Sequence, residues 1–156
     1  MRSGSCPSST TLHQTTSSRR TRRGTVRRMD PRTTAEQYLA ALSAADVDAI
    51  VALVTEDFVN EHTSELGSGL DGRAAYAERL PGFLAQFAAL QYEVVETIAE
   101  GDRVAARYRM TANFDGHPID IPGVMLFEIR DGLVAHRTDV WDSLTFLRQT
   151  GAVEER

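Results

Sequence analysis

Apolar residues recur at helical spacing in three stretches of the first half of the chain. Thr33 opens a Thr-x-x-Glu capping box, and the apolar positions behind it predict a helix that ends at about Ser43. Asp46 is placed to cap a second helix that follows at once. A third helix is predicted from about Gly72. Its core-facing stripe has the i, i+3, i+4, i+7 spacing and consists of Leu80, Phe83, Leu84 and Phe87.

The second half of the chain changes to a period of two, which is typical of strands with one buried face. Strands are predicted over residues 91–98, 102–114, 119–130 and 133–141, and an earlier one over 58–63. Asp115-Gly116 and Asp131-Gly132 are hairpin turn signals between the later strands. This part of the chain therefore reads as an antiparallel meander.

A last helix follows the strands, with Asp142 as its cap and Gly151 at its end. Helices gathered on one face of such a sheet define the α+β class. We expect a strongly curved, mostly antiparallel sheet wrapped by three N-terminal helices, with a short C-terminal helix. A long helix across a curved sheet leaves a concavity, which is the usual form of a small-molecule pocket.

Charge divides the chain into two unlike segments. Residues 1–32 hold eight arginines and one aspartate, a balance of +7, whereas residues 33–156 hold nine arginines and 21 acids, a balance of −12. The first segment is rich in Ser, Thr and Arg and has too few apolar residues to form a core, so it is predicted to be disordered. Three interpretations remain for it: a transit-like peptide, an arm for an anionic partner, or sequence upstream of a start at Met29, which we favour.

The remaining residues are expected to form one domain over 33–151, followed by a short tail over 152–156, because length and composition are those of a single globular unit. An acidic domain repels phosphate backbones, so no nucleic-acid partner is expected for it. No apolar run approaches the roughly 20 residues that span a bilayer, so no membrane partner and a cytoplasmic location are expected. Cys6 is the single cysteine, and the four histidines lack metal-ligand spacing. We expect neither a metal nor another cofactor.

Several short segments then resemble a known family. They are Thr55-Glu56-Asp57-Phe58-Val59-Asn60, Gly101-Asp102-Arg103-Val104-Ala105-Ala106-Arg107-Tyr108, Asp131-Gly132-Leu133-Val134 and Trp141-Asp142. With the element order, they resemble the nuclear transport factor 2-like superfamily, and its SnoaL-like, polyketide cyclase-like branch in particular. The resemblance covers about 33–151 and implies a cone-shaped, cystatin-like fold. The superfamily holds cyclases, isomerases, epoxide hydrolases, dehydratases and domains without catalysis, so fold does not fix function.

The resemblance implies two residues with proton chemistry. His62 falls where ketosteroid isomerases place a general-base aspartate, and a neutral imidazole near its reference pKa takes and returns protons at neutral pH. Asp139 matches the acid/base aspartate of the cyclases and lies on the same strand face as Trp141. The alternatives are a structural histidine for His62 and a solvated strand carboxylate for Asp139.

Other positions are implied to bind substrate. Arg107 aligns with an arginine that pairs with the aspartate in the hydrolases, although a register shift of one residue would turn it to solvent. Tyr38 matches an oxyanion-hole tyrosine of the isomerases or is a core residue. Asn60 lies on the face of His62, where it either binds substrate or satisfies backbone groups. Three further residues are expected in the pocket wall or the core: Phe87, Met125 and Trp141.

These residues lead to three hypotheses. The first is a cofactor-independent enzyme in which Asp139, His62 or both move a proton on a small apolar carbonyl compound, giving cyclisation, isomerisation or elimination. The second is a binding module in which the same groups only orient a small apolar organic ligand. The third is a dimerisation module, because the resemblance implies a homodimer formed through the exposed face of the sheet.

Overall fold

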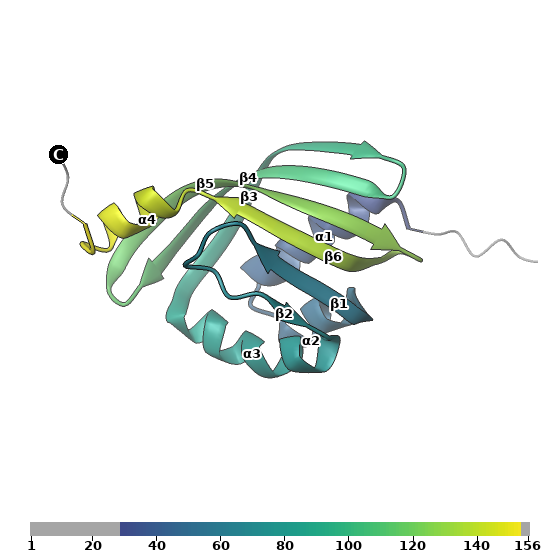
Figure 1. Cartoon of the computed structure of the whole chain (residues 1–156), viewed down its shortest axis with the longest axis horizontal. Helices are drawn as coiled ribbons and strands as arrows, with labels where there is room; N and C mark the ends of the chain where they lie inside the picture. Colours follow the sequence, from purple (N-terminus) through teal and green to yellow (C-terminus); the bar gives the residue numbers. More distant parts are fainter. Residues whose placement is uncertain (1–28, 154–156) are drawn as a thin grey trace, which may run out of the picture.

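The computed structural model describes residues 29–153, which form four helices and one six-stranded sheet (Figure 1). The helices are α1 (Pro31–Ser43), α2 (Val47–Ala52), α3 (Arg73–Gln86) and α4 (Ser143–Gln149). The strands are β1 (Val54–His62), β2 (Leu70–Asp71), β3 (Phe87–Glu100), β4 (Arg103–Phe114), β5 (His117–Arg130) and β6 (Leu133–Trp141). The predicted α+β class is confirmed, and the element order is as predicted except for the two-residue strand β2, which was not predicted.

The sheet has the order β2-β1-β6-β5-β4-β3, in which β1 runs parallel to β6 and all other neighbours are antiparallel. The last four strands are the predicted meander. Asp115-Gly116 and Asp131-Gly132 have positive φ at both residues, as the tight turns of twisted hairpins require. Both turn predictions are therefore confirmed.

Three helices cover one face of this sheet, with α1 lying across it behind the strands in Figure 1 and α3 bordering it below. The buried side of α1 is the apolar stripe of its sequence, with Tyr38, Leu39 and Leu42 almost fully enclosed. Burying a side chain of this size stabilises the fold by about 1.5–3 kcal/mol. The apolar face of α1 and the inward-facing apolar residues of the strands thus pack into one core.

Irregular pairing bends the sheet around that core. The pairing of β3 with β4 shifts between Ala88 and Gln91 and again between Val94 and Glu96, and Ala89 has a φ of 54°. Such bulges increase the local twist and bend of a strand. The bend lets β3 follow α3 directly from Phe87, four residues earlier than the period of two indicated.

Helix α1 begins two residues before the predicted capping box. The side chain of Asp30 accepts a hydrogen bond from the Arg32 amide, and Pro31 occupies the first turn, where a missing N–H costs nothing. Pro31 and Arg32, expected in the disordered segment, are therefore helical. Met29 and Asp30, also in that segment, are described and are neither helix nor strand. Residues 1–28 of that prediction and the last three residues of the predicted C-terminal tail lie outside the described residues.

Strand β1 also begins earlier than predicted. Thr55, Glu56 and Asp57 break the apolar pattern, but they are extended, and Arg73 and Arg130 pair with the carboxylates of Glu56 and Asp57. Thr55 is buried beside Val54, whereas Glu56 and Asp57 are both exposed, so this end of the strand departs from the period of two at the irregularity in its pairing with β6. Among residues 29–153, no helix is both long and apolar enough to cross a membrane.

Candidate functional site

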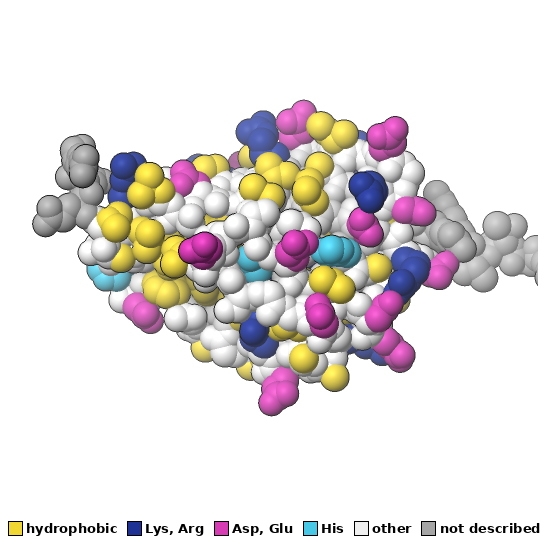
Figure 2. Space-filling view, in the orientation of Figure 1, with side chains coloured by type: hydrophobic (Ala, Val, Ile, Leu, Met, Phe, Trp, Pro, Cys, Tyr) yellow, Lys and Arg dark blue, Asp and Glu magenta, His cyan; other side chains and the backbone are white. Residues whose placement is uncertain are grey.

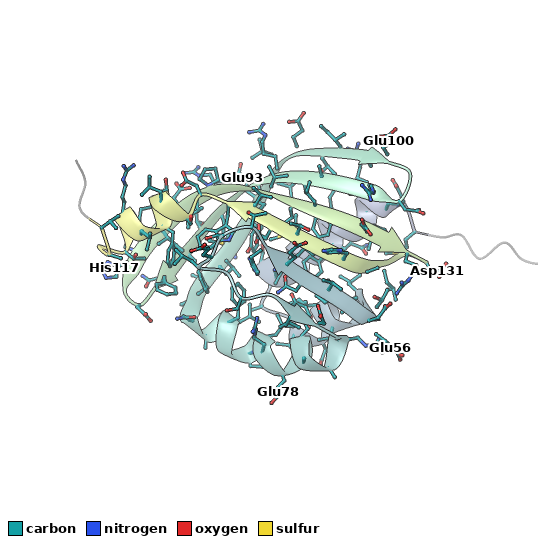
Figure 3. The ribbon with its side chains drawn as sticks, viewed as in Figure 1. Glu56, Glu78, Glu93, Glu100, His117 and Asp131 are labelled. Atoms are coloured by element: carbon teal, nitrogen blue, oxygen red, sulfur yellow. The ribbon has the colours of Figure 1, made fainter. Side chains whose placement is uncertain are left out.

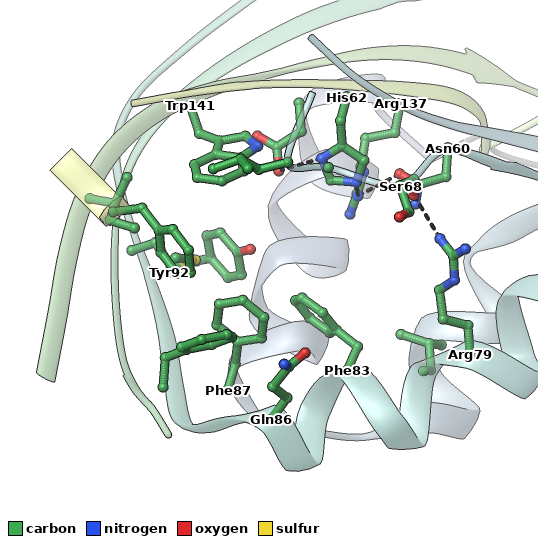
Figure 4. Close-up of a pocket in the computed structure, with 18 of the residues that line it drawn as sticks. Asn60, His62, Ser68, Arg79, Phe83, Gln86, Phe87, Tyr92, Arg137 and Trp141 are labelled. Carbon is green, nitrogen blue, oxygen red and sulfur yellow. Dashed lines mark hydrogen bonds and ion pairs between the residues drawn. The ribbon is translucent and has the colours of Figure 1, made fainter. Parts of the chain in front are cut away.

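A cavity of about 510 Å³ lies between α3 and the inner face of the sheet (Figure 4). Aromatic side chains form one part of its wall. This aromatic wall includes Phe83, Phe87, Tyr92, Phe114, Trp141 and Phe146. Within it, Phe114 and Trp141 each contact Phe146 edge to face, and Phe87 contacts Phe83 and Phe114 at tilted angles. The volume is within the range of small-molecule sites, and a wall of this kind favours an apolar ligand body.

His62 and Asp139 face each other at one side of the cavity. They are direct neighbours in the parallel pairing of β1 with β6, and His62 Nδ1 lies 4.0 Å from Asp139 Oδ2. Their side chains are only 16% and 7% exposed. The distance exceeds a hydrogen bond, and Nδ1 is buried without a hydrogen-bond partner among the described residues. The pair is thus brought together by strands that are far apart in sequence.

The imidazole of His62 is a weaker base than the sequence suggested. Burial lowers its pKa to about 4, and the positive charges of Arg137 and Arg79 add to this effect. The ring is therefore neutral at pH 7. Its Nε2 lies 3.4 Å from a nitrogen of Arg137, and a guanidinium can only donate, so Nε2 is the acceptor and Nδ1 carries the proton. That N–H lies on the side of the ring that approaches Asp139.

The carboxyl group of Asp139 is held by a tyrosine. Tyr108 donates a hydrogen bond of 2.6 Å from its hydroxyl to Oδ1. Burial raises the pKa of Asp139, while the charge of Arg137 and the Tyr108 hydrogen bond oppose that rise. Gly123 makes this contact possible, since a Cβ on it would lie 2.3 Å from the Tyr108 hydroxyl.

Arg137 is the centre of a buried polar network below this pair. Its guanidinium donates to the Tyr38 hydroxyl at 2.9 Å and to the Asn60 side-chain oxygen, and it lies over the Tyr38 ring. The Tyr38 hydroxyl also bonds that of Tyr76. Burial raises the pKa of Tyr38 well above its ordinary value, against the opposing charge of Arg137. The phenol therefore stays neutral, and Arg137 carries the only full charge of the network.

A glycine-rich loop closes the cavity beside His62. A Cβ on Gly67 would lie 2.4 Å from the Cβ of His62, so only a glycine permits this close approach. Arg79 of α3 donates 2.6 Å to the carbonyl of Ser68 and so ties the loop to the helix (Figure 4). The loop and Arg79 form the edge of the cavity nearest to Asn60.

The structure places the sequence-predicted residues in three different settings. His62, Asp139, Asn60, Phe87 and Trp141 line the cavity, and their roles in binding or chemistry stay predictions. Tyr38 and Met125 are fully buried behind the lining, in the core.

Arg107 was expected to bind substrate, and this prediction is wrong. Its side chain is 57% exposed and pairs with Glu96 outside the cavity. Its neighbours Ala106 and Tyr108 are buried instead, so the even-numbered residues of this part of β4 face the interior and Arg107 faces outward.

His117 points away from the body of the molecule, as do the labelled acidic side chains (Figure 3).

Sequence reasoning missed Arg137, although a signal was available. Arg137 is two residues before Asp139 on β6, and the period of two that places Asp139 with Trp141 places Arg137 on the same face. A charged residue at an inward position of a strand is unusual and indicates a buried polar site.

Within the described part of the chain, no three His, Cys, Asp or Glu side chains are grouped to hold a metal ion.

Solved structures of similar shape identify the fold of this chain. The fold matches a protein with a ketosteroid isomerase-like fold from Catenulispora acidiphila, in complex with trimethylamine, at a TM-score of 0.70 and 18% identity, covering 76% of this chain and 92% of that one. It also matches an LEH-like epoxide hydrolase from M. tuberculosis at a TM-score of 0.68 and 21% identity, covering 78% and 92%. A protein assigned as a polyketide cyclase from Xanthomonas campestris matches at 0.68 and 24%, covering 77% and 98%. The chain thus has the nuclear transport factor 2-like fold.

The sequence narrows this class to a family. Residues 35–137 match the SnoaL-like domain, and the chain belongs to that family. No curated protein matches the chain. The matched range ends two residues before Asp139, so the family match itself does not extend to this carboxyl group.

Proposed function

We propose that this protein is a cofactor-independent enzyme that moves a proton on a small, mostly apolar carbonyl compound, as cyclases, isomerases and lyases do. The observation that carries the proposal is the pair of Asp139 and His62, a buried carboxyl and a neutral imidazole that face one cavity 4.0 Å apart. Buried titratable groups with shifted pKa values in a cleft are typical of acid/base sites. Membership of the SnoaL-like family supports the same class.

In the proposed reaction, Asp139 Oδ2 takes a proton from the carbon next to the substrate carbonyl, and the C–H electron pair passes into an enolate. The proton then returns from Asp139 to another atom of the substrate, so that the protein ends unchanged. A raised carboxyl pKa brings the donor and acceptor closer in basicity, which favours transfer in both directions. The Tyr108 hydrogen bond keeps Oδ1 occupied and leaves Oδ2 for the substrate.

His62 contributes a hydrogen-bond donor in this scheme. Its Nδ1–H is buried and without a partner among residues 29–153, so a substrate oxygen placed there would satisfy it. A neutral imidazole donor stabilises the charge that develops on that oxygen without carrying a charge of its own. Asn60, Phe87 and Trp141 are proposed to bind the substrate, since they line the same cavity.

The test begins with mass spectrometry of small molecules that the purified protein retains, which identifies a substrate or a close analogue. With that compound, Asp139→Asn is expected to lower kcat by about 10²–10⁴-fold, the usual contribution of an acid/base group. His62→Gln is expected to lower it less. Glu61→Gln is the control, because Glu61 lies between Asn60 and His62 in sequence but on the outer face.

Full turnover in both Asp139→Asn and His62→Gln would contradict the proposal. Ligand binding without any product at any pH, unchanged in the double variant, would support a binding module of the same fold instead.

We also propose that the protein forms a homodimer through the outer face of the sheet. Four large apolar residues are exposed there on β3, β5 and β6: Val95, Ile98, Leu126 and Val140. Figure 2 shows hydrophobic patches beside acidic side chains over these strands. Light scattering after size exclusion is expected to give twice the chain mass, and Leu126→Glu to give the monomer. A monomeric wild type at high concentration would contradict this proposal.

A further inference from the structure

The cavity has a charge opposite to that of the domain around it. Within the described residues, its charged lining side chains are Arg79, Arg137 and Asp139, and His62 is neutral. The cavity therefore carries a net charge of about +1 when Asp139 is ionised and more when it is protonated, while residues 33–156 sum to −12. A cationic site inside an acidic domain attracts an anion and concentrates it there.

Arg137 has no carboxylate partner in the structure. Its hydrogen bonds go to the neutral side chains of Tyr38, Asn60 and His62, and its Nε is buried with no partner among the described residues. Asp139 acts on it only at longer range, because Oδ1 is held by Tyr108 and Oδ2 faces His62. A buried guanidinium without a close counter-ion destabilises the empty site, because its lost hydration is not replaced by an opposite charge. A ligand with an anionic oxygen would offset part of that cost.

The two arginines lie at the same end of the cavity. Figure 4 shows Arg79, Ser68, Asn60 and Arg137 together at one side of the site, whereas Trp141, Tyr92 and Phe87 lie at the other. The cavity thus has a cationic end and an aromatic end, with His62 and Asp139 between them. This arrangement is complementary to a molecule with an apolar body and a charged head.

We infer that the substrate carries a carboxylate, which the Arg79 and Arg137 end of the cavity binds while the apolar body lies against the aromatic wall. This inference rests on the proposed function and narrows its substrate class to apolar carbonyl compounds that are also carboxylic acids. A carboxylate at the arginine end leaves the neighbouring carbon atoms beside Asp139 and His62, where the proton is moved. Arginine is suited to this task, since its planar fork matches the two oxygens of a carboxylate.

The test compares 3-phenylpropanoate with 3-phenylpropanamide, which have the same apolar body and differ in charge. Trp141 is the single tryptophan of the chain and lines the cavity, so its fluorescence reports binding of either compound. The wild type is expected to bind the carboxylate about tenfold more tightly than the amide, because hydrogen bonds to a charged acceptor are stronger than those to a neutral one. Equal affinities would overturn the inference.

Substitution of the two arginines tests whether they cause the preference for the carboxylate over the amide. Arg79→Gln is expected to lower the preference about threefold, since this side chain is partly solvated, and Arg137→Gln to abolish it. Arg107→Gln is the matched control, because Arg107 is an exposed arginine outside the cavity, and it is expected to change nothing. Amide binding in Arg137→Gln shows that the variant is folded. A preference that survives in a folded Arg137→Gln would overturn the inference.

This test can fail separately from that of the proposed function. Asp139→Asn removes the one negative charge of the lining, so it is expected to bind the carboxylate more tightly while losing turnover. If Asp139→Asn loses turnover but the wild type binds acid and amide alike, the acid/base proposal stands and the carboxylate inference is wrong.

Discussion

The two faces of the β1 and β6 pair carry the same kinds of group with opposite properties. On the outer face, His136 Nε2 lies 2.9 Å from Glu61 Oε2, and Thr138 donates to the same oxygen. These hydrogen bonds lower the pKa of Glu61, that from His136 most. On the inner face, His62 and Asp139 form a similar pair, yet burial raises the pKa of the carboxyl and lowers that of the imidazole.

Residue type therefore does not decide the proton chemistry of such a pair; its surroundings do. Hydrogen bonds on the outer face support the charged form of Glu61, whereas the cavity wall disfavours charge on Asp139 and His62. Because adjacent residues of a strand point to opposite faces, Glu61 and His62 experience these two environments although they are neighbours in the chain. Four predictions test how far the faces differ.

The largest effect is expected from the pH dependence of stability. The pKa of His62 is about 4 in the folded protein, against a reference value of 6.5 for an unfolded chain. Between these two pH values the unfolded chain binds a proton at His62 and the folded protein does not. The free energy of unfolding should fall as the pH drops from 6.5 to about 4 and then level off. The loss attributable to His62 is about 3 kcal/mol.

Urea denaturation of the wild type and His62→Gln over this pH range measures that loss as the difference between the two proteins. Asp139 acts in the opposite sense, since a raised pKa lets the folded state bind a proton first, but it is present in both proteins. Superimposable pH profiles would show that the imidazole is not buried as described.

The second prediction concerns the network below the pair. Tyr38→Phe removes the hydroxyl that accepts from Arg137 and bonds Tyr76, while it keeps the buried ring. A buried guanidinium N–H left without an acceptor costs about 2 kcal/mol. Tyr92→Phe is the control, since no hydrogen bond of its hydroxyl is present among the described residues. Equal midpoints in urea for the two variants would contradict this account.

The third prediction tests how closely the inner face is packed. Gly123→Ala places a methyl group against the Tyr108 hydroxyl and is expected to cost about 1.5 kcal/mol, since overpacking displaces a side chain. It should also weaken the hold of Tyr108 on Asp139. Gly82→Ala is the control, because its Cβ meets nothing within 4 Å and α3 gains about 0.5–1 kcal/mol from alanine. Destabilisation by both variants alike would count against the close approach.

The fold could be predicted because its elements are encoded locally. Strand β6 has the predicted bounds 133–141, and its Asp131-Gly132 turn has the expected backbone. The errors lie where local signals compete: Thr33 offered a capping box, but Asp30 and Pro31 start α1 two residues earlier. Strand β1 was predicted too short because Thr55, Glu56 and Asp57 interrupt the apolar pattern, and because they lie at an irregularity in the pairing with β6 that the period of two does not anticipate.

The candidate site was predictable only in part, because it depends on pairing between distant strands. His62 and Asp139 were each suggested by resemblance, but their contact requires the parallel pairing of β1 with β6, which no local pattern encodes. Arg107 was assigned to the site by resemblance, although the alternation of apolar residues along its strand places it on the outward face. Arg137 obeyed that parity and was overlooked, which shows that inward charged positions of a strand merit the same scrutiny as aligned residues.

The smallest effect is expected on the outer face. Glu61→Gln breaks the hydrogen bond with His136, but both side chains are in contact with water, which solvates whichever group is left alone. The midpoint of unfolding should therefore shift less than in Gly123→Ala, and the shift should disappear at high salt, since exposed pairs are screened. Turnover should stay unchanged, because this carboxylate does not reach the cavity. If Glu61→Gln destabilised the protein as much as Tyr38→Phe does, the two faces would not differ in exposure as the pairing of β1 and β6 requires, and the contrast between the two histidines would lose its physical basis.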